Sequence, residues 1–224
     1  MKDGYRHEYK YFISDAAAYL LKRRLPHIMK PDPHCGGAGG YTIRSLYFDD
    51  FTGSAFQDKV AGVRERTKYR IRYYNYDDSA IKLERKEKLG GLTRKLSQDI
   101  TREEALALER CRVPADVQGL MGELRRGCRF DGLRPRVLVD YDRAPFVCAD
   151  GNTRITLDEN LRTRPYCAGL FASHCAMQPV LAPDQVILEV KFDDFLPGYL
   201  SEALEDIPKI SIAVSKYVLC ANLL

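Results

Sequence analysis

The sequence KYRIRYY, residues 68–74, alternates like a β-strand but has an unusual charged face. Successive side chains of a strand point to opposite faces of a sheet. One face of this stretch therefore carries three cations, Lys68, Arg70 and Arg72, while the other face is apolar and aromatic. Two interpretations fit this row: a charged face that lies in water, or a face that binds an anion.

Several other segments divide into one charged and one apolar face in the same way. The charged face of residues 81–88 holds three lysines and Glu84, and that of residues 186–192 holds Glu189 and Lys191. In a closed barrel, helices would cover the apolar faces and the charges would line the interior, where they need partners. A ring of cations with few carboxylates then favours a polyanion, gripped by arginine forks, together with a divalent metal.

Composition limits what kind of anion-binding protein this is. The chain has 224 residues, 45% hydrophobic and 29% charged, and its net charge is only +4. Anion binding must therefore come from local clustering of cations, because the field of the whole molecule is weak. The modest charge and the interspersed glutamates argue against a nucleic-acid groove. We expect one domain spanning residues 1–224.

The cysteines and the N-terminus predict a cytoplasmic location. Seven scattered cysteines with no C-x-x-C spacing do not resemble a secreted disulfide framework. A metal site at Cys167, His174 and Cys175 is an alternative to idle thiols, although its spacing fits no common zinc pattern. The first residues contain no apolar signal segment, and no stretch is long and apolar enough to span a membrane.

Periodicity and capping signals predict an α+β fold. Ser14 predicts the start of a helix that runs to about Leu25, and Thr101 with Glu104 forms a capping box that opens another through about Arg110. We expect further helices from Pro114 and over residues 199–205. The expected strands are 5–13, 41–50, 63–74, 80–88, 92–100, 135–148, 153–164, 185–194 and 215–223. About eight strands with a few helices predict a closed eight-stranded antiparallel β-barrel with helices packed outside.

A set of short motifs resembles the VTC domain in both composition and order. The motifs are RHEYKYFI (6–13), SLYFDD (45–50), KYRIRYY (68–74), KLERKEK (82–88), RITLDENL (154–161), ILEVKF (187–192) and SKY (215–217). That domain is the polyphosphate polymerase domain of the vacuolar transporter chaperone complex and its bacterial relatives. Its superfamily is that of the triphosphate tunnel metalloenzymes, or CYTH-like proteins. The resemblance covers nearly the whole chain and implies a basic tunnel of eight strands, open at both ends.

The resemblance also implies roles for particular residues of this sequence. The implied catalytic cations are Arg70, Arg72, Lys86, Arg143 and Arg154. The implied phosphate-binding residues are Lys10, Lys95, Tyr141, Ser215 and Lys216. Glu189 matches the metal-binding glutamate, which would hold Mn²⁺ or Mg²⁺. The implied ligands are ATP or another triphosphate, and polyphosphate.

The implied activity is transfer of the γ-phosphate of ATP to a polyphosphate chain. A hydrolase that uses water as the acceptor, and a binding module without turnover, are the alternatives. Ala213 stands where the family commonly has a lysine, which bears on polymerisation more than on phosphate binding. Glu8 and Glu84 are either further metal ligands or partners of neighbouring Arg and Lys side chains. The sequence leaves the acceptor, the metal preference and the partner proteins open.

Overall fold

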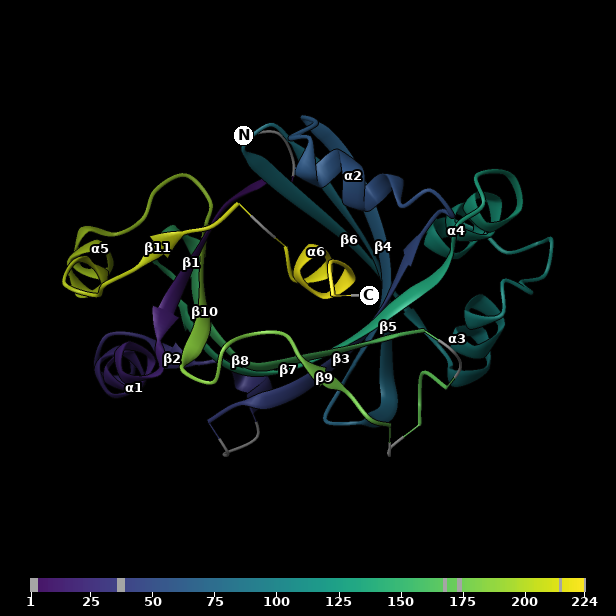
Figure 1. Cartoon of the computed structure of the whole chain (residues 1–224). Coiled ribbons are helices and arrows are strands. Elements are labelled where there is room, and N and C mark those ends of the chain that lie inside the picture. Colours follow the sequence, from purple (N-terminus) through teal and green to yellow (C-terminus); the bar gives the residue numbers. More distant parts are fainter. Residues whose placement is uncertain (1–3, 36–38, 167–168, 173–174, 214, 224) are drawn as a thin grey trace.

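The strands of the computed structural model form one sheet that closes on itself. The model describes residues 4–35, 39–166, 169–172, 175–213 and 215–223. Its strands are β1 (Arg6–Ser14), β2 (Lys30–Pro31), β3 (Tyr41–Asp49), β4 (Glu65–Tyr74), β5 (Asp77–Leu89), β6 (Leu92–Ile100), β7 (Arg134–Cys148), β8 (Thr153–Pro165), β9 (Gln178–Pro179), β10 (Gln185–Phe192) and β11 (Ile210–Ser211). Eight of them pair in the order β7-β3-β4-β5-β6-β1-β10-β8, and β8 pairs again with β7 (Figure 1). The predicted closed antiparallel barrel is confirmed.

Six helices accompany the barrel in the described part of the chain. They are α1 (Asp15–Arg24), α2 (Ser54–Val60), α3 (Arg102–Glu109), α4 (Gly119–Phe130), α5 (Gly198–Glu205) and α6 (Lys216–Ala221). The predicted caps are confirmed: the Ser14 side chain accepts from the Ala17 amide, and Thr101 forms a capping box with Glu104. The helix expected from Pro114 begins only at Gly119. None of the described helices has the length and apolar character needed to cross a membrane.

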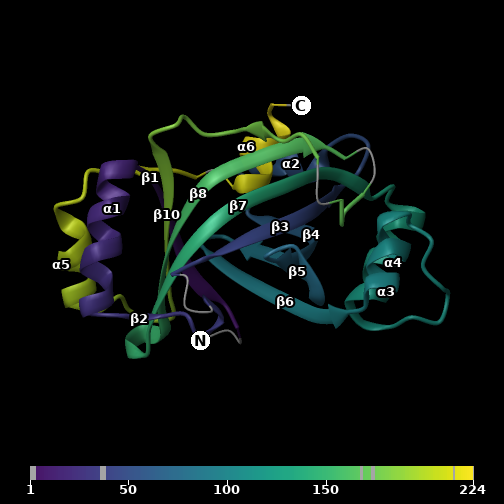
Figure 2. The same ribbon diagram turned by 90° about the horizontal axis from the view of Figure 1, so that it is seen from below.

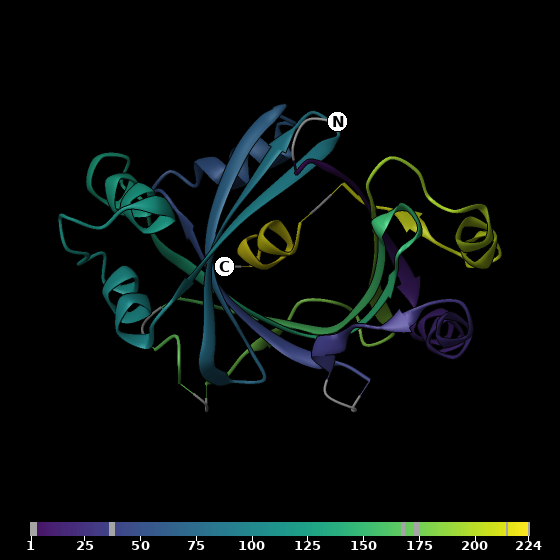
Figure 3. The same cartoon turned by 180° about the vertical axis from the view of Figure 1, so that it is seen from behind.

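Two layers of helices cover opposite outer faces of the barrel. Figure 3 shows α1 and α5 on one side of the ring and α3 and α4 on the other. Helices α1 and α5 pack on apolar side chains of β7, β8 and β10, while α3 and α4 pack on β3, β4 and β5. Tyr69 and Tyr73 of β4 pack beneath α3 and α4, as expected for aromatic side chains on the apolar face of this strand. The apolar faces of β4, β5 and β10 therefore point outward, and their charged faces line the interior.

The β4–β5 hairpin fixes the register of the charged faces. Asn75 and Tyr76 have φ angles of 51° and 56°, so this tight turn consists of two left-handed residues. The turn is shorter than residues 75–79, which the predicted strands 63–74 and 80–88 leave between them, because Asp77 already belongs to β5. In this register Arg70 lies opposite Glu84, which sets an arginine beside a carboxylate inside the barrel.

The C-terminal segment is helical, so the strand predicted over residues 215–223 is wrong. Ser215 begins α6 by accepting a hydrogen bond from the Val218 amide at 3.4 Å. The helix lies within the outline of the ring when seen along the barrel, and the perpendicular view places it near one end, beside α2 (Figures 1 and 2). Tyr217 and Val218 are buried there among inward-facing side chains of β3 and β7. Helix α6 therefore covers part of one end of a tunnel that was expected to be open at both ends.

Candidate functional site

The two central arginines of β4 are held by cross-strand neighbours. Arg70 donates from Nε to Glu84 Oε2 at 2.6 Å and from Nη1 to the Tyr47 hydroxyl at 2.8 Å. Arg72 donates from Nη2 to the Tyr141 hydroxyl at 3.0 Å. Glu84 is fully buried, and although burial would raise its pKa, Arg70 and Arg72 hold that pKa well below its usual range. Glu84 is thus an ionised partner of these arginines, which agrees with its interpretation as a partner of neighbouring Arg and Lys side chains.

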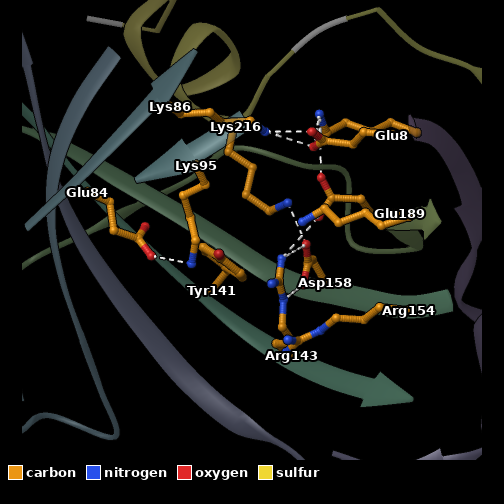
Figure 4. A network of polar contacts seen from close by, with 12 residues as sticks. Glu8, Glu84, Lys86, Lys95, Tyr141, Arg143, Arg154, Asp158, Glu189 and Lys216 are labelled. Carbon is orange, nitrogen blue, oxygen red and sulfur yellow. Dashed lines mark hydrogen bonds and ion pairs between the residues drawn. The ribbon is translucent and has the colours of Figure 1, made fainter. Parts of the chain in front are cut away.

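A second group joins β7, β8 and α6 through one buried carboxylate. Arg143 binds Asp158 with two parallel hydrogen bonds of 2.6 and 2.8 Å, and Lys216 Nζ lies 2.5 Å from Asp158 Oδ2 (Figure 4). Burial would raise the pKa of Asp158, but Arg143 and Lys216 outweigh burial and lower it. Lys216 also lies over the Tyr141 ring, 4.8 Å from its centroid. The N-terminal turn of α6 is therefore attached to the barrel wall by charge.

A third group surrounds two glutamates on the neighbouring strands β1 and β10. The carboxyl groups of Glu8 and Glu189 lie within hydrogen-bonding reach of each other (Figure 4). Lys10 Nζ is 2.7 Å from Glu8 and 3.5 Å from Glu189, Lys86 Nζ is 2.7 Å from Glu8, and Lys191 Nζ is 3.1 Å from Glu189. Burial would raise the pKa of Glu8, but Lys86 and Lys10 lower it to about 2. Burial would also raise the pKa of Glu189, but Lys191 and Lys10 hold it well below its usual range, so both carboxylates are charged near neutral pH.

This glutamate pair fits a divalent cation that also takes ligands from a substrate. Mg²⁺ is usually bound by one or two carboxylates together with phosphate oxygens and waters. Among the described residues, no group of three or more His, Cys, Asp or Glu side chains could hold a metal ion. A metal held by the facing oxygens of Glu8 and Glu189 would therefore need further ligands from outside these side chains, such as phosphate oxygens.

The remaining predicted residues lie toward the two ends of the lumen. Lys95 Nζ is 2.8 Å from Glu84 Oε1, and Arg154 Nη2 is 2.7 Å from Asp32 Oδ2 and 2.8 Å from the Tyr41 hydroxyl. Both cations line a cavity of about 330 Å³, the Tyr41 cavity, which also includes the Tyr41 and Tyr74 rings. At the other end, Ser215 Oγ lies 3.4 Å from Lys68 Nζ.

All eleven predicted site residues line one interior space. It consists of the Tyr41 cavity, a central cavity that includes Arg70, Arg143 and Glu189, and an α2 cavity near helix α2. Lys86 lines all three cavities, so they adjoin along the lumen. The structure thus brings the predicted residues together, and their individual roles stay predictions.

Several lumen residues were missed at the level of the sequence. Asp158 and Tyr47 each contact a predicted site residue across a pair of neighbouring strands, whereas Lys191 contacts Glu189 within β10. Asp158 could have been found as the carboxylate that ends the R-x-x-x-D spacing from Arg154. The alternative metal site cannot be assessed as a set, since Cys167 and His174 lie outside the described residues.

Solved structures share this fold at low sequence identity. One, described as a candidate adenylate cyclase from Bacillus halodurans, is 17% identical, with a TM-score of 0.51 and 90% of each chain covered. Another, from the Schizosaccharomyces pombe Mediator head module, is 7% identical, with a TM-score of 0.53, 93% of this chain covered and 100% of the other. These likenesses concern the fold alone, which hosts proteins of different kinds. A comparison with curated proteins found no match.

The family can be assigned from the sequence over nearly its full length. The model of the family described as "VTC domain" matches residues 5–224. This match includes every strand of the closed barrel and every one of the eleven predicted lumen residues. The chain therefore belongs to the VTC domain family.

Proposed function

We propose that the protein is a metal-dependent phosphotransferase that moves the γ-phosphate of ATP onto a polyphosphate chain inside the barrel. The observation that carries this proposal is the enclosed row of cations beside the facing pair Glu8 and Glu189. Arg70, Arg72 and Arg143 line the same central cavity as Glu189. Fixed cations in a space shielded from water favour an anion strongly, because they need not reorganise when it arrives.

The arginines would bind the triphosphate by exchanging one anionic partner for another. Arg70 and Arg143 each form an ion pair with a carboxylate, Glu84 and Asp158 respectively. Their planar forks offer further N–H groups to phosphate oxygens. Phosphoryl transfer needs mainly alignment and charge neutralisation, so these side chains would hold the γ-phosphate in line with its acceptor.

Glu8 and Glu189 would hold Mn²⁺ or Mg²⁺, which would supply positive charge that neutralises the phosphates during transfer. Lys10 and Lys86 lie against the same carboxylates and would turn toward the phosphates. Lys216, fixed by Asp158 at the start of α6, would orient the acceptor phosphate.

The same geometry would serve a hydrolase if water replaced the acceptor phosphate. The bases of ATP and other nucleotides could pack on Tyr41 and Tyr74, whose rings meet edge to face with centroids 5.4 Å apart. This aromatic pair in the Tyr41 cavity favours a nucleotide over a bare triphosphate as the donor. It does not discriminate between water and phosphate as the acceptor.

The test is product analysis after incubation of the purified protein with ATP and Mn²⁺. We expect a ladder of polyphosphate on a polyacrylamide gel, with free phosphate assayed in parallel. Glu189→Gln and Arg70→Ala should each lower ladder formation by about 100-fold or more, the loss typical when a group that stabilises the transition state is removed. Arg24→Ala is the control, because Arg24 pairs with Asp206 on the outside of the barrel.

Each of the other outcomes would assign a different function to the protein. Free phosphate without a ladder would indicate a tunnel hydrolase. Neither product, with tight binding of tripolyphosphate retained, would leave a binding module and contradict the enzyme assignment. Equal activity in the wild-type and Arg70→Ala proteins would place the reaction outside this lumen.

A further inference from the structure

Two cysteines in the outer helical layer lie close to each other and away from the lumen. Cys111 follows α3 by two residues, and Cys128 lies near the end of α4. Both side chains pack in the apolar layer outside β3, β4 and β5. The helices α3 and α4 contact each other on this side of the ring (Figure 3). Both cysteines are free thiols, and their sulfur atoms lie within hydrogen-bonding reach of each other.

The end of α3 places the Cys111 thiol beside α4. Cys111 has a φ angle of 52°, in the left-handed region where the end of a helix usually has glycine. Its amide donates to the Leu108 carbonyl at 2.9 Å, and the Arg112 amide donates to the Ala107 carbonyl at 2.8 Å. These are the two hydrogen bonds of a Schellman motif. A defined backbone turn therefore fixes the position of Cys111.

The end of α4 places the Cys128 thiol on the facing side. Cys128 continues the buried stripe of Leu120 and Leu124 at a spacing of four residues. The chain then folds back, because Leu133 packs against Gly127 so closely that a Cβ there would meet Leu133 Cδ1 at 2.4 Å. The Leu133 carbonyl lies 3.6 Å from the Cys111 sulfur. Packing from both helices thus holds the two thiols against each other.

The two thiols differ in reactivity. Arg134 Nη1 donates to the Cys128 carbonyl at 2.5 Å and to the Leu133 carbonyl at 2.7 Å, which sets a cation beside the pair. A hydrogen bond from Cys128, together with Arg134, lowers the pKa of Cys111 to about 7, although burial opposes the shift. The hydrogen bond to Cys111 and burial raise the pKa of Cys128. Cys111 is half-buried and Cys128 is buried, so Cys111 is the more reactive thiol.

We propose that Cys111 and Cys128 form a reversible disulfide when the protein meets hydrogen peroxide. The Cys111 thiolate attacks one peroxide oxygen, the O–O bond breaks, and after protonation the products are a sulfenic acid and water. The Cys128 sulfur then attacks the sulfenic sulfur, and its proton leaves with the hydroxide as a second water. Two thiols thus lose two electrons to one peroxide. A reducing dithiol would reverse the bond by exchange.

The disulfide would join α3 covalently to α4. It would close residues 111–128 into a ring, which limits the freedom of this segment in the unfolded chain. The two helices cover the outer face of the β4–β5 hairpin, whose inner face carries Arg70 and Glu84. Peroxide would therefore strengthen the layer that covers this hairpin. The inference is independent of the proposed function, because neither thiol belongs to the lumen.

The test counts free thiols in the full chain by intact mass spectrometry after alkylation under denaturing conditions. Untreated protein should take up seven alkyl groups, one for each cysteine. Protein treated with a small excess of hydrogen peroxide should take up two fewer, and dithiothreitol should restore them. Cys111→Ser and Cys128→Ala should each abolish this loss. Cys148→Ser is the matched control, because Cys148 is also half-buried but contacts the Tyr199 hydroxyl instead.

Thermal denaturation of the peroxide-treated protein, before and after dithiothreitol, measures the effect of the bond. We expect the Tm to be higher by about 5 °C or more while the bond is intact. Dithiothreitol does not reduce methionine sulfoxide, so the difference belongs to the disulfide. An unchanged Tm would contradict the joining of α3 to α4.

Two results of the thiol count would overturn the proposal. One is an unchanged count in the peroxide-treated wild-type protein, and the other is the same loss of two thiols in Cys111→Ser. Because Cys111 is only half-buried, Cys111→Ser keeps the test decisive even if Cys128→Ala fails to fold.

Discussion

At the scale of single residues, the lumen is a set of cations balanced by a few carboxylates. Asp158 shows the principle, since it is fully buried and holds both Arg143 and Lys216. Removal of one partner from a buried ion pair leaves an uncompensated charge in a poorly hydrated space. The stability of the ligand-free protein therefore depends on residues that also prepare the site for phosphate.

The Asp158→Asn substitution should destabilise the protein by about 3–5 kcal/mol, because it leaves Arg143 and Lys216 without a counter-charge. Urea denaturation of the wild-type and variant proteins measures this difference. Tripolyphosphate should restore part of the loss by replacing the missing negative charge. As a control, Asp206→Asn removes an exposed partner of Arg24 and should leave the denaturation midpoint unchanged. Equal effects of the two substitutions would contradict the role given to Asp158.

Binding of phosphate should be linked to protonation of Lys68. The pKa of this lysine is lowered to about 7 from 10.5, so it is mostly neutral above that value in the ligand-free protein. Its contribution makes the folded state less stable as pH falls from about 10 to 7, because the unfolded chain binds more protons there. An anion favours the charged form, so the affinity for tripolyphosphate should fall as pH rises through the same window.

Calorimetry at about pH 8.5, in two buffers of different ionisation enthalpy, measures this proton uptake. We expect wild-type protein to take up a substantial fraction of a proton on binding, and Lys68→Met to take up less. The same uptake in both proteins would show that Lys68 is not the group that titrates.

Much of the site could be predicted at this scale, and what was missed depends on register. Alternation alone placed Arg70, Arg72 and Glu189 on charged faces, because side-chain direction in a strand is a local property. The pairing of Arg143 with Asp158 depends on how β7 and β8 align, which alternation does not specify. Lys59, which lines the α2 cavity, was missed because it belongs to a helix that folds back over β4.

At the scale of elements, the C-terminal helix sets the geometry of one end of the lumen. The segment YVLCANL resembles a buried strand, because short apolar runs do not separate strands from helices by periodicity. Ser215 is the signal that was misread, since it caps α6 as well as lining the lumen. The chain uses one residue both to start the helix and to position Lys68 and Lys216.

Ser215→Ala should lower stability by about 1 kcal/mol, the usual cost of losing a helix cap, and should also weaken binding of tripolyphosphate. Ser14→Ala is a closely matched control, since Ser14 caps α1 on the outside of the barrel at 3.1 Å from the Ala17 amide. It should cost similar stability and leave binding unchanged. Thermal denaturation and calorimetry of both variants distinguish the two effects. Equal affinity of the two variants for tripolyphosphate would show that α6 does not contribute to the site.

At the scale of the whole molecule, a closed sheet turns scattered charges into one enclosed site. Helices on opposite faces cover the apolar exterior, so the charged faces of β1, β4, β5 and β10 have only the lumen to face. The fold class was predictable because many segments share this two-faced pattern. The pairing of β1 with β6, which helps to close the barrel, was harder to predict from the sequence, because only two residue pairs join these strands.

The distribution of charge along the barrel also bears on the departure at Ala213. This residue lines the α2 cavity, together with Lys59 and Lys88. The absence of a lysine at position 213 therefore does not deplete this end of cations. The positive charge that the C-terminal segment lacks at this end is supplied by Lys59 of α2, Arg66 of β4 and Lys88 of β5.

The most direct test of the central claim is a crystal structure of the protein with tripolyphosphate and Mn²⁺, with the metal located by anomalous scattering. The account predicts phosphates among Arg70, Arg72 and Arg143, with the metal between Glu8 and Glu189. Phosphate or metal bound only outside the barrel, with the ion pairs of Glu84 and Asp158 undisturbed, would contradict it.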